Sequence, residues 1–234
     1  AEKGIKVILG SRDMDKGKKA LEELAAQEIE ADLIQYDAAD LEAPKKIYNY
    51  ISEKYNKLDI LVNNAGVLLT GNLFVTNSTT VSDKDIKETF QTNLFSVISL
   101  TQALLPLIKK SDAGRIVNVS TILSSLTLHT TENSPIAPAK EFAYNASKTA
   151  LNAFTIHLAL ELKDTNKKVN SGHPGWVKTE LGGHSEKIFN ADLWIISPGV
   201  PQNISIVKTA YKKKIEIISE IEFAKEIKIG ILVF

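Results

Sequence analysis

Short apolar runs alternate with amphipathic segments along most of the chain, and this alternation limits the possible folds more than any other feature. Runs rich in Val, Ile and Leu lie at residues 5–9, 31–36, 58–62, 114–120 and 167–171. The segments between them carry apolar residues at helical spacing, at 13–28, 40–55, 83–109 and 144–163. Strands that alternate with helices form parallel sheets, so we expect a single doubly wound α/β domain that binds ligands beyond the carboxyl ends of its strands.

Composition excludes several classes of function. The 28 Lys and Arg residues equal the 28 Asp and Glu residues, so nothing favours binding to nucleic acid or to anionic membranes. There is no cysteine and there are only four scattered histidines, so we expect no disulfide and no metal centre. No apolar run approaches the roughly 20 residues of a membrane span, which favours a soluble, cytoplasmic protein with small-molecule partners.

The two ends of the chain depart from the α/β plan. Residues 1–4 read as the end of a helix capped by Gly4 directly before a strand, so we expect an earlier strand and helix to be absent. Their absence would leave backbone groups of the neighbouring strands unpaired. Residues 207–228 are rich in Lys, Glu and Ile, and 229–234 could form an edge strand or an aggregation-prone end. We therefore divide the chain into a core at 1–183 and an atypical C-terminal segment at 184–234.

Tyr144 and Lys148 form the first chemical signal. A spacing of four residues on a helix places a phenol and an ammonium group on one face, a turn apart. A cation at about 4 Å in an intermediate dielectric lowers a tyrosine pKa by the order of 3 units. The pair therefore predicts a tyrosine that exchanges protons near neutral pH.

Five motifs, of which the Tyr144–Lys148 pair is the fourth, follow one another along the chain. They are Asn63-Asn64-Ala65-Gly66 after an apolar strand, Gln91-Thr92-Asn93, Gly114 to Thr121, Tyr144 to Lys148, and Pro174 to Thr179. This set resembles the short-chain dehydrogenase/reductase family, and within it the carbonyl-reductase-like members, over about residues 4–183. The resemblance implies a Rossmann-like fold and an NADP(H)-dependent oxidoreductase that transfers hydride between nicotinamide and a carbonyl or secondary alcohol.

The resemblance also implies roles for individual residues. Tyr144 exchanges a proton with the substrate oxygen, while Lys148 lowers its pKa and binds the nicotinamide ribose. Asn93 breaks its helix locally and holds a water on the proton path to Lys148. The substrate-orienting hydroxyl, usually a serine, falls on Thr121, with Ser120 as the alternative. The insert before Tyr144 is a family trait that goes with monomers.

Cofactor contacts are implied at the ends of several strands. Arg12 favours NADP(H) because a guanidinium accepts a 2′-phosphate, although it could simply be exposed beside a helix cap made by Asp13. Asp37 matches the family acid that contacts adenine, whereas Asp40 is expected to cap a helix. The remaining implied contacts are the turn residues Asn63, Ala65 and Gly66 and the nicotinamide-pocket residues Pro174, Gly175, Val177 and Thr179.

One family motif is missing from the chain. The glycine-rich turn that binds pyrophosphate belongs to the strand and helix expected before residue 5. The rival hypotheses are therefore a catalytically impaired remnant with at most a protein-interaction role, or a gene fragment whose upstream sequence encodes that turn.

Overall fold

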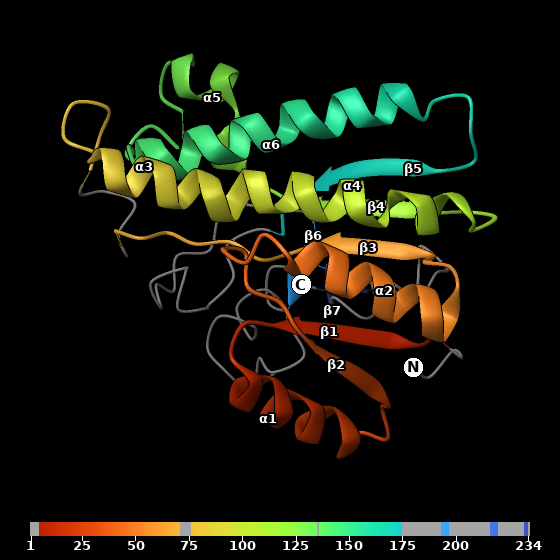
Figure 1. Ribbon diagram of the computed structural model, residues 1–234. Coiled ribbons are helices and arrows are strands. Elements are labelled where there is room, and N and C mark those ends of the chain that lie inside the picture. The colour runs from red at the N-terminus through yellow and green to blue at the C-terminus, as the bar shows by residue number, and fades with distance from the viewer. Residues whose placement is uncertain are drawn as a thin grey trace.

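The computed structural model describes residues 5–70, 76–134 and 136–174, together with the backbone of strands at 193–196, 216–219 and 232–233. Its main sheet has six parallel strands in the order β2-β1-β8-β3-β4-β5 (Figure 1). These strands are β1 (Val7–Ser11), β2 (Ala31–Gln35), β3 (Ile60–Asn63), β4 (Arg115–Val119), β5 (Lys168–Gly172) and β8 (Leu232–Val233). A separate parallel pair is formed by β6 (Leu193–Ile196) and β7 (Glu216–Ser219). The prediction of a parallel α/β fold is confirmed.

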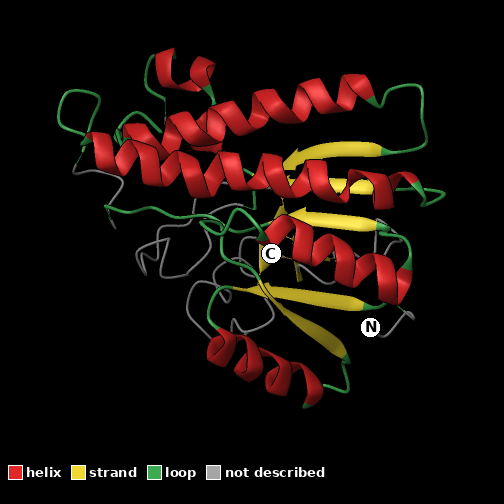
Figure 2. Ribbon diagram, in the orientation of Figure 1, coloured by secondary structure: helices red, strands yellow, loops and turns green. Residues whose placement is uncertain are grey.

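Helices cover the sheet and enclose the core. They are α1 (Met14–Ala25), α2 (Ala43–Tyr55), α3 (Asp83–Phe90), α4 (Ser96–Lys109), α5 (Leu126–Thr130) and α6 (Phe142–Glu161), with a π-helical turn η1 (Gln91–Phe95) and a 3-10 turn η2 (Ile122–Ser124). Figures 1 and 2 show α2, α4 and α6 along the front of the sheet, while α1 packs against β1 and β2. Aliphatic side chains of the sheet, α2 and α4 fill the core: Ile47, Ile51, Leu61, Leu100, Leu104, Leu107, Ile108 and Ile116.

Local sequence signals set most helix starts. Asp13 caps α1 by accepting hydrogen bonds from the N–H groups of Asp15 and Lys16. Ser82 caps α3 through Asp85 N–H at 3.0 Å. The prediction that Asp40 is the cap residue of α2 is wrong, because Glu42 occupies the N-cap position. Asp40 lies in the preceding turn, where its carboxylate accepts the backbone N–H of Glu42. The helix starts later because Pro44, which lacks an N–H, is suited to the first helical turn.

The position between β1 and β3 is filled by β8. Ile8 and Leu9 of β1 pair with Leu232 and Val233, and Val62 of β3 also pairs with Val233. The expectation of unpaired neighbours is therefore wrong at these positions, and so is the alternative of an edge strand. A strand in this gap gains backbone hydrogen bonds on both sides, whereas an edge position offers one.

Val233→Pro is expected to lower the free energy of unfolding by about 1–3 kcal/mol, because proline removes an N–H and fits poorly in a central strand. Urea denaturation followed by circular dichroism measures the change. An unchanged midpoint would contradict the central placement of β8.

The segment Asp83–Lys109 is one continuous helical rod, with α3, η1 and α4 in sequence. Within the described residues, it is the one helix long and apolar enough to cross a membrane by length and composition. Half of its most apolar window is buried inside the fold, against the sheet, α2 and α6. It therefore behaves as a core helix in this structure.

Candidate active site

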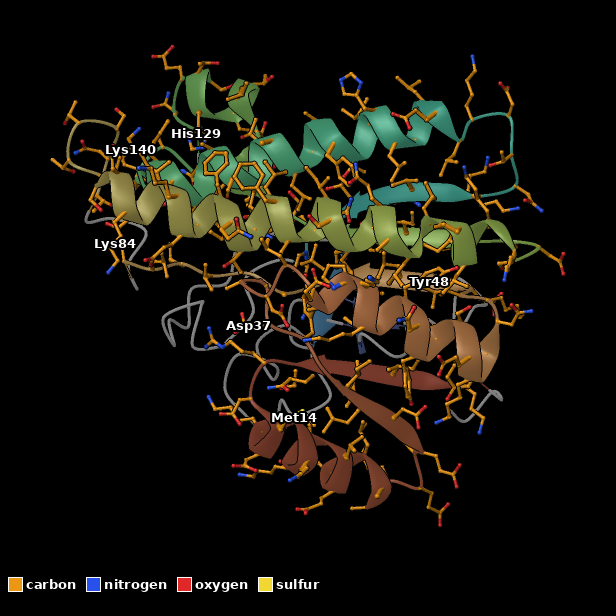
Figure 3. All side chains as sticks on the ribbon, viewed as in Figure 1. Met14, Asp37, Tyr48, Lys84, His129 and Lys140 are labelled. Atoms are coloured by element: carbon orange, nitrogen blue, oxygen red, sulfur yellow. The ribbon has the colours of Figure 1, made fainter. Side chains whose placement is uncertain are left out.

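The predicted site residues converge on one edge of the sheet. Because the strands of the main sheet are parallel, their carboxyl ends share that edge, where α/β proteins bind ligands. Arg12 follows β1, Asp37 lies on the loop after β2, and Thr121 follows β4. Figure 3 shows Asp37 toward the same end of the molecule as His129 of α5 and Lys140 before α6.

Tyr144 and Lys148 occupy the same buried face of α6. The face is formed by Ala143, Tyr144, Ser147, Lys148, Leu151, Thr155 and Leu158. Tyr144 is 8% exposed and Lys148 3% exposed. The helical spacing therefore brings the two side chains to one side of the helix, as the sequence predicts.

The Lys148 side chain is directed to the sheet. Its Nζ donates a 2.8 Å hydrogen bond to the backbone oxygen of Val119, at the end of β4. Burial lowers the pKa of Lys148 to about 8, because the ammonium loses hydration that one carbonyl does not replace. The cation is thus held just beyond the end of a central strand.

Tyr144 lies in an apolar cluster built largely by the insert that precedes it. Leu123, Ile136 and Ala139 pack around the ring, and Leu68 and Leu128 flank the cluster. Burial raises the pKa of the phenol to about 12, and the negative charge of Glu141 adds to the rise.

The expected acidification of Tyr144 by Lys148 is therefore wrong for this arrangement. The two side chains share a helix face but extend to different partners, since the ammonium binds a carbonyl of the sheet while the ring enters the apolar cluster. The phenol stays protonated at neutral pH, which suits a proton donor.

Asn93 lies in the π-helical turn η1 and is fully buried, so the predicted local break in its helix is present. Its Oδ1 accepts from Val67 N–H at 2.8 Å, and its Nδ2 donates to Val67 O and to Ser147 Oγ at 3.1 Å. Ser147 Oγ in turn donates to the backbone oxygen of Tyr144 at 2.8 Å. This chain of hydrogen bonds ties the turn after β3 to the reactive helix.

Gly66 lies against both Lys148 and Asn93. A Cβ at Gly66 would be 3.4 Å from Lys148 Nζ and 3.5 Å from Asn93 Oδ1. A larger side chain would therefore crowd the space between the two polar groups. The role of Asn93 in holding a water there stays a prediction.

Thr121 and Ser120 differ in the state of their hydroxyl groups. Thr121 caps η2 by accepting from Leu123 N–H at 3.2 Å, so among the described residues its own proton has no acceptor. Ser120 is buried and donates to Ser124 Oγ. This difference favours Thr121 as the hydroxyl that can orient a substrate.

Of the other expected cofactor contacts, some lie at the carboxyl edge of the sheet and some lie outside the described residues. Asn63 is buried, and its Nδ2 donates to Thr101 Oγ1 of α4 and Asn118 Oδ1 of β4. Its Oδ1 is buried without a hydrogen-bond partner among the described residues, and the expected contact of Asn63 with a cofactor stays a prediction. Ala65 is half-buried in the turn that follows, and Pro174 follows β5. Gly175, Val177 and Thr179 lie outside the described residues.

Arg12 and Asp37 remain at the surface of this edge. The Arg12 guanidinium is exposed and makes no hydrogen bond or ion pair with any described residue. Asp37 is half-buried and its Oδ1 accepts from Ala39 N–H. Within the same part of the chain, no group of three or more His, Asp or Glu side chains could hold a metal ion.

Two residues of the site, Ser147 and Glu141, have functions that the residue pattern alone does not reveal. Ser147 stands inside the Tyr144–Lys148 motif, and only the fold shows that it links Asn93 to the helix. Glu141 precedes Tyr144 by three residues, the offset at which a cap residue receives a backbone N–H. That offset is the one signal of Glu141 in the sequence.

A parallel sheet with a buried Tyr/Lys helix face beyond its carboxyl edge defines a Rossmann-like α/β oxidoreductase. A family model described as short chain dehydrogenase matches residues 1–187, and the chain belongs to this family.

Individual relatives agree with this assignment. Short-chain dehydrogenase/reductase 1 of Saponaria officinalis is 31% identical over 232 residues, covering 77% of this chain and 76% of the relative. Human NADPH carbonyl reductase 1 is 27% identical over 212 residues, covering 76% and 74%. The solved carbonyl reductase Sniffer of D. melanogaster is 27% identical with a TM-score of 0.63, covering 76% of this chain and 83% of that chain. Across four curated relatives, the match spans 51–76% of their own length.

Proposed function

We propose that the chain is an NADP(H)-dependent oxidoreductase that transfers hydride between nicotinamide and a carbonyl or secondary alcohol carbon. The observation that carries the proposal is the buried face of α6 at the carboxyl edge of the sheet, which holds Tyr144 and Lys148 and is joined to the buried Asn93 through Ser147. Similarity to a human carbonyl reductase named for NADPH supports both the cofactor and the substrate class.

The residues present fit a nicotinamide cofactor at several points. Gly66 leaves open space beside Lys148 and Asn93, and Arg12 offers an exposed guanidinium with no partner among the described residues. Arg12 would hold the 2′-phosphate and Asp37 the adenine, with the Ala65–Gly66 turn beside the adenosine. Lys148 would bind the nicotinamide ribose, and the nicotinamide would meet Pro174, Gly175, Val177 and Thr179. The bound cofactor would supply or accept the hydride.

The chain's own groups move the proton. Thr121 donates its free hydroxyl proton to the substrate oxygen and so polarises the carbonyl. Tyr144, protonated because of its high pKa, donates its proton to the same oxygen as negative charge develops there. Asn93 holds the turn at Val67 against Ser147, which keeps the helix at a fixed distance from the sheet edge. We propose a soluble, cytoplasmic and monomeric enzyme.

Nicotinamide fluorescence on titration with NADPH tests the proposal, together with NADPH oxidation in the presence of a panel of ketones and aldehydes. Saturable micromolar binding and turnover are expected. The second candidate is a remnant of the family without catalytic activity. It is favoured by β8, which lies between β1 and β3, where the family has the strand that leads into its glycine-rich turn. Absence of both binding and turnover would support that candidate.

Arg12→Ser is expected to weaken NADPH binding by about 10- to 100-fold, because hydrogen bonds to a charged group contribute roughly 1.5–3 kcal/mol. NADH binding should change little, since NADH has no 2′-phosphate. The matched control is Lys18→Ser, which removes an exposed cation of α1 that pairs with Asp15. Equal losses for both nucleotides would contradict the assigned preference for NADP(H).

A further inference from the structure

Glu141 places a carboxylate inside the protein at the start of the reactive helix. The residue is 2% exposed and occupies the N-cap position of α6. Its Oε2 accepts the backbone N–H of Tyr144 at 2.5 Å, and its Oε1 accepts the hydroxyl of Thr76 at 3.2 Å. One side chain thus joins the first turn of α6 to a segment that lies 65 residues away in the sequence.

A buried glutamate is an expensive way to cap a helix. Ser, Thr, Asp and Asn are the preferred cap residues, and any of them could accept the Tyr144 N–H. A buried carboxylate loses several kcal/mol of hydration unless a charge or hydrogen bonds replace it. Within the described residues, no Lys, Arg or His forms an ion pair with Glu141. The longer side chain is needed only for the second contact, with Thr76.

Among the described residues, Glu141 is the one charged group whose charge shifts the pKa of the Tyr144 phenol. The cluster around its ring is apolar, from Leu68, Leu123, Leu128, Ile136 and Ala139.

Nearby titratable groups of the packed elements are engaged or exposed. Lys148 binds the oxygen of Val119, and the Nε2 of His129 on α5 contacts the oxygen of Leu123. Lys140 is exposed. Helix α3 also packs against α6. Its charged residues are exposed except Asp85, whose carboxylate accepts a hydrogen bond from the Ser82 hydroxyl. Glu141 is therefore the charged group that acts on the phenol, and it raises the pKa of Tyr144 further above its buried value.

We propose that Glu141 is a positioning residue of the reactive centre, which fixes the first turn of α6 against the Thr76 segment and favours the proton-donating form of Tyr144 by its charge. This inference rests on the proposed function. In the reductive direction, the carbonyl carbon gains hydride and its oxygen takes the Tyr144 proton. A C–H and an O–H bond form, NADPH is oxidised to NADP⁺, and the tyrosinate recovers its proton from solvent. Glu141 therefore lowers the fraction of tyrosinate, which is the form that accepts a proton in alcohol oxidation.

Glu141→Gln tests the charge while keeping an oxygen acceptor for Tyr144 N–H. One unit charge about 10 Å away, at an effective dielectric of about 20, changes a pKa by about one unit. Alcohol oxidation needs the tyrosinate, so well below the Tyr144 pKa its rate follows the ionised fraction. The kcat for alcohol oxidation, measured at one pH below that pKa, should therefore rise about tenfold in Glu141→Gln, while kcat for carbonyl reduction should change little.

Three variants separate charge from positioning. Glu141→Asp keeps the charge and the cap but is too short to reach Thr76, and Thr76→Val removes the same contact from the other side. Both should raise KM and leave kcat for alcohol oxidation unchanged. Glu161→Gln, at the exposed far end of α6, removes an equal charge and should change neither quantity.

The outcome can be judged even without activity. The chain has six tyrosines, so subtracting the tyrosinate absorbance of Tyr144→Phe isolates the titration of Tyr144. A lower midpoint in Glu141→Gln than in the unsubstituted chain supports the proposal, while an identical midpoint, or an equal shift in Glu161→Gln, overturns it. Failure of every variant and of the unsubstituted chain to bind or oxidise NADPH would instead overturn the proposed function.

Discussion

Tyr144→Phe is expected to lower kcat for carbonyl reduction by roughly 10²- to 10⁴-fold, the usual contribution of a positioned acid or base. The change removes one hydroxyl from the site and keeps the ring that packs against Leu123, Ile136 and Ala139. NADPH affinity and the free energy of unfolding should stay within error of the unsubstituted chain. Steady-state kinetics, nicotinamide fluorescence and urea denaturation measure the three quantities.

Tyr48→Phe provides the matched control for this change. Tyr48 lies on α2, away from the reactive helix, as Figure 3 shows. Tyr48→Phe also removes one phenol hydroxyl, but outside the site, and this variant should retain full turnover. Full activity in Tyr144→Phe would refute the assignment of the proton donor, and a parallel loss in Tyr48→Phe would show that the assay reports stability.

Lys148→Met is expected to abolish turnover and, at neutral pH, to stabilise the fold. Burial lowers the pKa of Lys148 from 10.5 to about 8, which corresponds to a cost of about 3 kcal/mol for keeping the folded ammonium charged. Methionine has no charge to bury but loses the hydrogen bond to Val119, worth about 1–2 kcal/mol. The net gain in free energy of unfolding should be about 1–2 kcal/mol at pH 7.

The gain from Lys148→Met depends on pH with a definite sign. Between about pH 8 and 10.5, the unfolded chain still holds the lysine proton that the folded protein has lost, so the stability of the unsubstituted protein rises with pH. The cost of burying the Lys148 ammonium is fully present below pH 8 and disappears above pH 10.5. The stability advantage of Lys148→Met disappears over the same range. Urea denaturation at both ends of this range measures the effect. The exposed Lys163→Met should show no such trend, and a destabilised Lys148→Met at pH 7 would contradict the prediction.

The strands and most helix boundaries of the core followed from short stretches of sequence. Apolar runs predicted β1 to β5, and Asp13 and Ser82 marked helix starts, because a cap needs only a side-chain oxygen and an N–H two or three residues away. The misplacement of the α2 start came from a competing local signal, Pro44, within the same few residues.

For the functional residues too, local spacing predicted the position of each side chain but not its partners. A spacing of four residues was enough to place Tyr144 and Lys148 on one face of α6. The partner of each side chain was not predictable, since the Val119 carbonyl and the Leu123–Ile136–Ala139 cluster lie far from that motif or in the insert before it. The predicted pKa of Tyr144 was therefore wrong in direction, even though the residue was correctly found.

By itself, the sequence determined the class of fold and the face on which the reactive pair lies, because helical spacing, caps and apolar alternation act over a few residues. Only the tertiary structure decided that β8 fills the gap between β1 and β3, and that Glu141 reaches Thr76. It also decided that the phenol is desolvated rather than acidified. Hydration, charge and strand pairing at these points depend on groups distant in sequence, and folding alone brings those groups within contact distance.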